Sequence, residues 1–266
     1  LGHNVVCVDS DESKVEILKQ GRLPIFEPGL DELVAANAAR GRLGFTTSIA
    51  DGVRDAEVIF ITVGTPSRAD GSADMSWVEA VARELARVAT GYKVVAEKST
   101  VPVKTGEWVK RTLRLYNNHG AEFDVVSVPE FLREGTAVQD FMKPDRIVVG
   151  VESPRAEALM RQLFAPFKAP LIITDLKSAE LIKHASNSFL ALKVSYINFV
   201  ADICEQVGAD VTKVAEGMGY DRRIGRAFLH AGIGYGGSCL PKDVAAFINV
   251  ARETGCNCDI LQAVER

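Results

Sequence analysis

One cysteine stands in a stretch whose residue types suit covalent chemistry. Residues 232–243 read Gly-Ile-Gly-Tyr-Gly-Gly-Ser-Cys-Leu-Pro-Lys-Asp, so that Cys239 follows four closely spaced glycines. Glycines cluster where the backbone takes positive φ or approaches a ligand closely. Pro241 and the apolar-periodic run after it predict a helix beginning there, and the backbone amides of its N-terminus, with Lys242 nearby, favour the nucleophilic thiolate. A buried structural cysteine is the competing interpretation, but a packed core has no use for these glycines and charges.

A long helical pattern from Lys177 to about Val207 carries two polar residues that share a face. Lys183 and Asn187 are four residues apart. On a face turned toward the cysteine loop they would both bind a substrate oxygen, and otherwise they form a hydrated stripe. His184 has no second ligand beside it and the five cysteines lack paired spacing, so we predict no metal site.

Polar residues also follow three successive predicted strands. Strands at 58–63, 94–100 and 124–128 end near Thr65, Thr100 and the pair Glu130 and Glu134. The carboxyl ends of parallel strands meet at one edge of a sheet, where α/β proteins bind their ligands. We therefore expect these side chains to line one catalytic edge, with Thr65 as a cofactor contact.

The first residues resemble the middle of a dinucleotide-binding unit. Residues 4–9 form a buried-type strand that ends in Asp9, the kind of acid that binds the adenosine ribose, and Lys14 follows on a short helix. The Gly-x-Gly-x-x-Gly turn precedes such an acid by about 20 residues. We therefore expect the first strand, the phosphate loop and the first helix to be missing, and the helix that stops at Arg266 to be cut as well.

Composition places the chain among ordinary globular proteins. Its 266 residues are 47% hydrophobic and 25% charged, with a net charge of −4. No apolar run reaches the roughly 18 residues of a membrane-spanning helix, and there is no basic field for nucleic acid. Five scattered cysteines suit a reducing, cytoplasmic setting. We predict an α/β, Rossmann-like parallel sheet in residues 1–175, followed by an all-α domain with a long helix in residues 176–266.

Four motifs together resemble the nucleotide-sugar dehydrogenases of the UDP-glucose 6-dehydrogenase type. They are the cysteine loop and the stretches Glu97–Val103, Pro129–Gly135 and Glu180–Asn187. The likeness covers essentially the whole chain, although Lys104 and Val128 depart from the family's commoner pattern. It implies NAD as the cofactor, UDP-glucose as the substrate, and a missing C-terminal domain for the uridine diphosphate.

The resemblance also implies roles for individual residues. Cys239 would be the nucleophile, with Lys183, Asn187 and Asp243 as its partners, while Thr100, Glu130 and Glu134 hold a catalytic water and touch the nicotinamide side. Cofactor contacts would come from Asp9, Lys14, Thr65, Thr100, Glu134 and Lys242, and nucleotide-sugar contacts from Glu130, Phe131, Leu132, Arg133, Lys183, Asn187, Arg226, Phe228 and Gly236.

The chemistry implied is a double oxidation to UDP-glucuronate, a precursor of polysaccharides. Cys239 captures the intermediate aldehyde, and covalent capture divides one difficult reaction into easier steps. The likeness further implies a homodimer through the helix at 177–207.

Three alternatives stay open. GDP-mannose dehydrogenase has the same cysteine core, a cysteine hydrolase would need a histidine base that the loop lacks, and a non-catalytic dimerisation fragment leaves Cys239 unexplained.

Overall fold

The computed structural model describes residues 2–237 and 239–266 and divides into two compact units. The first unit comprises Leu1–Thr65 and Met75–Glu180, and the second comprises Pro66–Asp74 and Leu181–Arg266. Leu1 and Ser238, the serine of the cysteine loop, lie outside the described residues. The chain thus leaves the first unit at residues 66–74, returns to it at Met75, and enters the second unit again at Leu181.

The first unit is built on a five-stranded sheet. Its order is β3 (Val58–Ile61), β4 (Tyr92–Glu97), β5 (Glu122–Ser127), β6 (Ile147–Gly150) and β7 (Leu171–Thr174). Neighbouring strands are parallel except β5 and β6, which pair antiparallel at a single position. β1 (Val5–Val8) and β2 (Leu43–Thr46) form a separate parallel pair. The predicted α/β fold with a mainly parallel sheet is confirmed.

One expectation about β1 is wrong. The apolar run at 4–9 predicts a buried strand, and a strand does form at Val5–Val8, but Val5, Val6 and Val8 are between 39% and 49% exposed. The physical reason is that β1 hydrogen-bonds to β2 alone among the strands of the described residues. A two-stranded sheet provides few neighbouring side chains on either face, so the valines of β1 stay partly in solvent.

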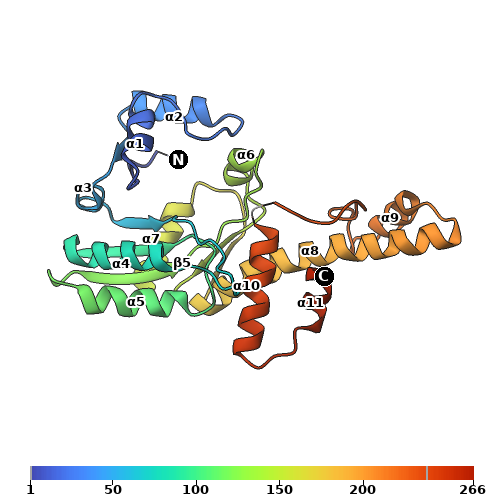
Figure 1. Ribbon diagram of the computed structural model, residues 1–266. Coiled ribbons are helices and arrows are strands. Elements are labelled where there is room, and N and C mark those ends of the chain that lie inside the picture. The colour runs from blue at the N-terminus through green and yellow to red at the C-terminus, as the bar shows by residue number, and fades with distance from the viewer. Residues whose placement is uncertain (1, 238) are drawn as a thin grey trace. The chain divides into compact units, whose positions relative to one another are not determined.

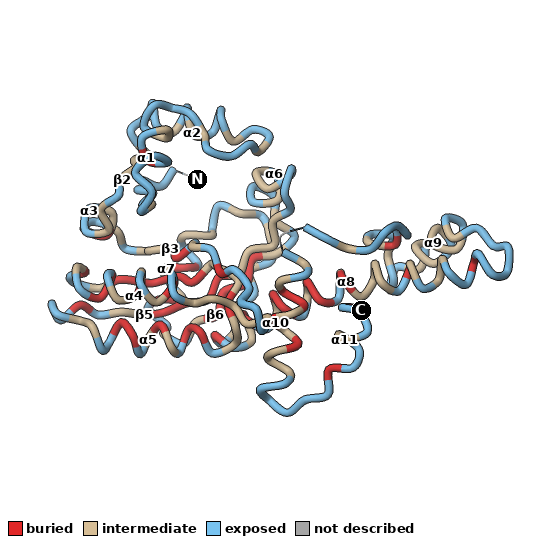
Figure 2. Tube along the Cα trace, in the orientation of Figure 1, coloured by how far each residue is buried: buried red, intermediate tan, exposed pale blue. Residues whose placement is uncertain are grey.

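Helices cover both faces of the five-stranded sheet (Figure 1). The first unit contains α1 (Glu12–Lys19), α2 (Leu30–Ala39), α3 (Ile49–Val53), α4 (Ser76–Val88), α5 (Thr105–Tyr116), α6 (Ala137–Met142) and α7 (Pro154–Phe164). Val95 of β4 packs into one core cluster with residues of α4 and α5, while its neighbour Val94 packs into another with residues of α7. Successive residues of a strand point to opposite faces, so both faces of β4 are buried. Figure 2 shows buried residues gathered in the strands of this sheet and in the helices packed on it.

The second unit is helical. It contains most of α8 (Leu176–Val207) together with α9 (Val211–Gly219), α10 (Leu240–Glu253) and α11 (Asp259–Glu265). Ala191 of α8, Val244 and Ile248 of α10, and Val264 of α11 form its core. The segment 66–74 packs on α10, where the Asn249 side chain donates to the carbonyl of Asp70 at 3.3 Å. The predicted long helix is confirmed.

Candidate active site

The cysteine loop leads directly into α10. Cys239 is exposed and occupies the N-cap position, and Pro241 lies in the first turn, so the predicted helix start is confirmed. Gly234 and Gly237 have φ values of 125° and 87°, which side chains rarely tolerate. The loop therefore needs glycine at these two positions, and it presents a thiol at the N-terminus of α10.

A buried carboxylate lies one helical turn after the cysteine. Asp243 is fully buried, and its Oδ2 accepts a 2.5 Å hydrogen bond from the side-chain amide of Asn187 on α8. Its Oδ1 lies 3.0 Å from the ammonium of Lys242. The backbone N–H of Asp243 donates to the carbonyl of Cys239, as expected for residues four apart on a helix. Cys239, Asp243 and Asn187 are thus joined in one cluster within the second unit.

α8 contributes a second buried polar side chain to this unit. Lys183 is buried one turn before Asn187, so a cation and an amide lie on the same face of the helix. His184 is also buried, and its ring stacks on Phe247 of α10 with the ring centres 6.1 Å apart. Desolvated cations and amide donors stabilise developing negative charge more strongly than they do in water.

The remaining predicted residues of the second unit lie in the segment between α9 and α10. The guanidinium carbon of Arg226 lies 5.8 Å from the ring centre of Tyr220. Phe228 has a φ of 65°, a left-handed conformation that is strained for a bulky residue. Gly236 is exposed. In the same segment Arg223 pairs with Asp221 at 2.6 Å.

In the first unit the ends of two neighbouring strands are linked. The hydroxyl of Thr65, after β3, donates to the carbonyl of Thr100, after β4, at 2.7 Å. The hydroxyl of Ser99 donates to the carbonyl of Val63 at 2.8 Å, which fixes the same two strand ends. These bonds position the Thr100 segment at the carboxyl edge of the sheet, where the sequence predicts ligand chemistry.

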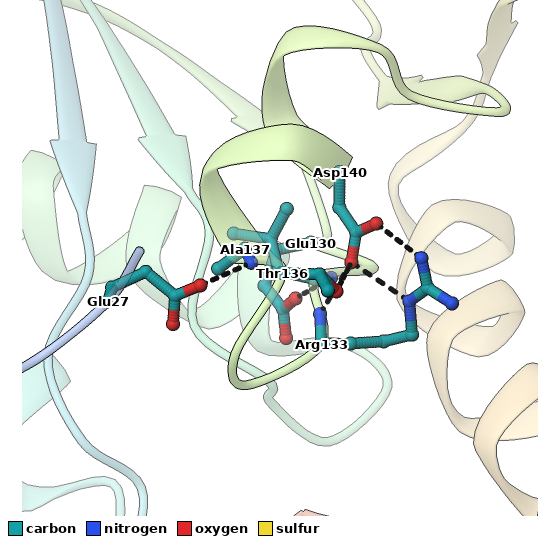
Figure 3. A network of polar contacts seen from close by, with 7 residues as sticks. Glu27, Glu130, Arg133, Thr136, Ala137 and Asp140 are labelled. Atoms are coloured by element: carbon teal, nitrogen blue, oxygen red, sulfur yellow. Dashed lines mark hydrogen bonds and ion pairs between the residues drawn. The ribbon is translucent and has the colours of Figure 1, made fainter. Parts of the chain in front are cut away.

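The third strand end forms a compact polar network around α6 (Figure 3). Glu130 accepts the backbone N–H of Leu132 through Oε2 at 2.5 Å. Arg133 donates to Asp140 through its backbone N–H and through Nε, both at 3.0 Å, and through its terminal guanidinium nitrogen at 2.6 Å. The Arg133 guanidinium lowers the pKa of Asp140 below its usual range, so this ion pair holds the segment at neutral pH.

Figure 3 also shows a contact that sequence reasoning missed. Glu27, in the segment between α1 and α2, accepts the backbone N–H groups of Gly135 and Ala137 at 3.0 and 2.7 Å. Its carboxylate therefore caps the start of α6 from about a hundred residues earlier in the chain. Glu27 stands in a Pro-Ile-Phe-Glu-Pro-Gly turn, and nothing in that local pattern names its distant partner.

Two buried carboxylates, for which the sequence predicted no role, flank the Thr100 segment. Glu97 ends β4 and accepts the backbone N–H of Ser99 at 2.9 Å. Glu180, on α8, accepts the backbone N–H groups of Lys104 and Gly106. Burial raises the pKa of Glu97 to about 8 and that of Glu180 to about 7, although the hydrogen bonds from backbone N–H groups oppose both shifts.

The predicted cofactor residues at the start of the chain fit the chemistry of a ribose. Asp9 follows β1, is half exposed, and lies 3.7 Å from the ammonium of Lys14 on α1. An exposed carboxylate at the end of a parallel strand can accept hydrogen bonds from two adjacent hydroxyls. The predicted residues after β5 differ in exposure: Phe131 is partly buried, whereas Glu134 is exposed. The guanidinium carbon of Arg146 lies 3.7 Å from the centre of the Phe131 ring.

In the described part of the chain no helix is long and apolar enough to cross a membrane. Within the same residues no three His, Cys, Asp or Glu side chains gather as they would around a metal ion.

Sequence profiles assign both units to one family. Residues 1–168 match the profile of the UDP-glucose/GDP-mannose dehydrogenase family, NAD binding domain, and residues 177–266 match the central domain of the same family. The predicted resemblance and the predicted cofactor, NAD, are thereby confirmed.

Individual relatives agree with these profiles. A UDP-glucose 6-dehydrogenase of Rhizobium meliloti is 54% identical over 95% of this chain and 59% of its own length. A UDP-glucose dehydrogenase structure from Pyrobaculum islandicum is 44% identical, with a TM-score of 0.96 over 99% of this chain and 62% of that one. A GDP-mannose dehydrogenase structure from Pseudomonas aeruginosa is 34% identical, with a TM-score of 0.81 over 99% and 62%. The chain thus spans about 60% of the length of these relatives.

Proposed function

The chain belongs to the UDP-glucose/GDP-mannose dehydrogenase family, and we propose that it carries the NAD-binding and catalytic parts of an enzyme that oxidises UDP-glucose to UDP-glucuronate. The names of the Rhizobium and Pyrobaculum relatives support UDP-glucose as the substrate. The five cysteines are free, which fits a reducing compartment, and we assign the reaction to the cytoplasm.

The observation that carries this proposal is the cluster at the start of α10. An exposed thiol at Cys239 and a buried carboxylate at Asp243 are four residues apart, and Asn187 is hydrogen-bonded to that carboxylate. A nucleophile, a base and an amide donor are the groups that covalent oxidation of an aldehyde requires. Buried Lys183 adds a cation one turn away from Asn187 on the same helix.

In the proposed reaction these residues act in sequence. NAD, when bound, accepts one hydride in each of two oxidations. After the first oxidation, which also releases a proton, the sulfur of Cys239 bonds to the aldehyde carbon and forms a thiohemiacetal. Loss of the second hydride, together with the proton of the adduct's hydroxyl group, converts this adduct to a thioester. Asp243 then takes a proton from a water that attacks the thioester carbon, and cleavage of the carbon–sulfur bond leaves the carboxylate product and restores Cys239.

Other residues are proposed to bind and orient the reactants, following the family's pattern. Lys183 and Asn187 stabilise the oxyanion of each tetrahedral adduct. Thr100 and Glu130 hold the attacking water, while Asp9, Lys14, Thr65, Thr100, Glu134 and Lys242 contact NAD. Phe131, Leu132, Arg133, Arg226, Phe228 and Gly236 contact the nucleotide-sugar, together with Glu130, Lys183 and Asn187.

We further propose that two copies associate through α8. Large apolar side chains are exposed along one face of this helix, at Phe189, Tyr196, Phe199, Ile203 and Val207. Light scattering should give twice the monomer mass for the wild type and the monomer mass for Phe199→Lys. Glu205 lies about 120° around the helix from Phe199, so the control variant Glu205→Lys should leave the dimer intact.

The function is tested by counting NADH at 340 nm in the protein expressed from its complete gene. The wild type should form two NADH for each UDP-glucose supplied. Cys239→Ser should lose turnover and form at most one NADH per active site. Without the sulfur, the aldehyde cannot form the thiohemiacetal from which the second hydride is lost. Cys256→Ser changes an exposed cysteine of the same unit that has no proposed role, and it should keep full activity. The absence of NADH with every nucleotide-sugar tested would refute the proposal.

GDP-mannose is the second candidate substrate, because the Pseudomonas structure named as a GDP-mannose dehydrogenase matches nearly the whole chain. The same assay with GDP-mannose in place of UDP-glucose decides between them. A higher kcat/KM for GDP-mannose would transfer the proposal to that sugar.

A further inference from the structure

Glu180 forms an unusual contact between the start of α8 and the start of α5. Its side chain is only 2% exposed, and its two carboxylate oxygens accept the backbone N–H groups of Lys104 at 2.6 Å and Gly106 at 2.7 Å. Lys104 is the N-cap residue of α5, and its own side chain makes no capping hydrogen bond. Glu180 therefore supplies, from a different helix, the acceptor and the negative charge that a helix N-terminus favours.

The packing around this carboxylate leaves room for it and for little else. A Cβ atom added to Gly106 would lie 3.2 Å from Oε1 of Glu180 and 3.3 Å from a methyl carbon of Leu176. Gly150 meets the same turn of α8 from β6, where an added Cβ would lie 2.7 Å from the Cβ of Ala179. Glycines at these two positions let the first turns of α8 approach α5 and β6 closely. This close approach brings Glu180 to the N-terminus of α5.

The segment between β4 and α5 carries Thr100 and is held at both ends. Near β4, the backbone N–H of Ser99 donates to Glu97, and the carbonyl of Thr100 accepts from Thr65. At the other end, Glu180 holds the N–H groups of Lys104 and Gly106. The conformation of the few residues between these anchors, Thr100 included, therefore depends on the Glu180 carboxylate.

We propose that Glu180 is a positioning residue for the oxidation: it holds the Thr100 segment in its reactive conformation from the helix that also carries Lys183 and Asn187. The inference rests on the proposed function, in which Thr100, Lys183 and Asn187 act on the reactants. Glu180 itself touches backbone N–H groups, so its effect on the reaction is transmitted through the segment that it holds.

The test uses Glu180→Gln and Glu180→Asp in the protein expressed from its complete gene. Gln presents one acceptor oxygen and an amide group that cannot accept, so one of the two N–H groups loses its partner. Hydrogen exchange at the Lys104 and Gly106 amides should then accelerate by about tenfold. Because small misplacements of reacting groups are costly, kcat should fall by about ten- to a hundredfold while both KM values stay within about threefold. Asp keeps two acceptors on a shorter side chain, and its kcat should lie between those of Gln and the wild type.

Glu107→Gln is the matched control. Glu107 is a half-exposed carboxylate in the first turn of α5 that pairs with Lys177. The same chemical change is therefore made close by without altering the hydrogen bonds that Glu180 accepts. It should leave both the amide exchange and kcat unchanged.

The outcomes separate this inference from the proposed function. A wild type that forms no NADH refutes the proposed function, and the positioning role falls with it. An active wild type whose Glu180→Gln variant keeps kcat within about twofold refutes the positioning role alone. If Glu180→Gln does not fold, Gly106→Ala tests the same contact from α5, since its Cβ crowds Oε1, and a full kcat in that variant overturns the inference.

Discussion

Lys104 gives the sharpest test of the backbone geometry. It has a φ of 78°, a left-handed conformation that side chains disfavour and that glycine adopts readily. We therefore predict that Lys104→Gly stabilises the first unit.

The size of the effect follows from two opposing contributions. A left-handed residue with a Cβ atom costs about 1–2 kcal/mol, which glycine relieves. Glycine also gives the unfolded chain more freedom, which offsets about 0.5–1 kcal/mol of that gain. The net increase in the free energy of unfolding should be about 0.5–1 kcal/mol. Removal of a lysine charge from a helix N-terminus adds a few tenths of a kcal/mol at most, because Lys104 is exposed.

Tryptophan fluorescence during urea unfolding measures this free energy in the right unit, since both tryptophans, Trp77 and Trp108, belong to the first unit. Two variants serve as controls. Lys104→Ala removes the charge and keeps the strain, so it should stay within about 0.5 kcal/mol of the wild type. Lys143→Gly makes the same exchange at an exposed helix end with φ of −134°, and should lose about 0.5–1 kcal/mol. Equal destabilisation by Lys104→Gly and Lys143→Gly would refute the reasoning.

Three further predictions concern buried groups. Burial raises the pKa of Glu97 from 4.5 to about 8, so the unfolded state ionises first and the stability of the wild type falls as pH rises between these values. Glu97→Gln removes this loss. In urea unfolding, its gain in free energy of unfolding over the wild type should be larger at pH 8 than at pH 5, by on the order of 3 kcal/mol. An equal gain at both pH values would contradict the buried carboxylate. Asn187→Asp places a second carboxylate against buried Asp243. Unfolding followed by circular dichroism should show the second unit destabilised by about 3–5 kcal/mol at pH 7, with partial recovery at pH 5. The control Asn187→Ala should lose only about 1–3 kcal/mol at either pH. Gly150→Ala forces a methyl group against Ala179 and should cost about 1–3 kcal/mol by tryptophan fluorescence, and an unchanged unfolding midpoint would mean that α8 can shift away from β6.

The sequence predicted those parts of the site that depend on local patterns. Buried apolar runs located β3, β4 and β5, and the hydroxyl and acidic residues after them lie at the strand ends where the pattern placed them. Pro241 and the apolar period after it located the start of α10, and with it the position of Cys239. These predictions succeed because a strand or a helix start is specified by residues adjacent in sequence.

What the sequence could not predict depends on partners far apart in the chain. Glu27 and Glu180 each stand in an ordinary local setting, a turn and a helix, and both bind backbone N–H groups 74 or more residues away. Backbone N–H groups are present at every residue and leave no mark in the sequence. The exposure of β1 was missed for a related reason, since a run of valines shows that burial is favourable but not whether neighbouring strands provide it.

The two distant glutamates share a consequence for the loops that they hold. α5 and α6 follow the segments that carry Thr100 and Glu134, and in neither helix does the N-cap side chain, Lys104 or Thr136, make a capping hydrogen bond. By contrast α7, which follows no candidate site residue, is capped by its own Ser153. In α5 and α6 a distant carboxylate supplies the acceptor that a Ser, Thr, Asp or Asn side chain supplies at a local cap. The shape of each loop therefore depends on a glutamate far away in the sequence as well as on the loop's own residues.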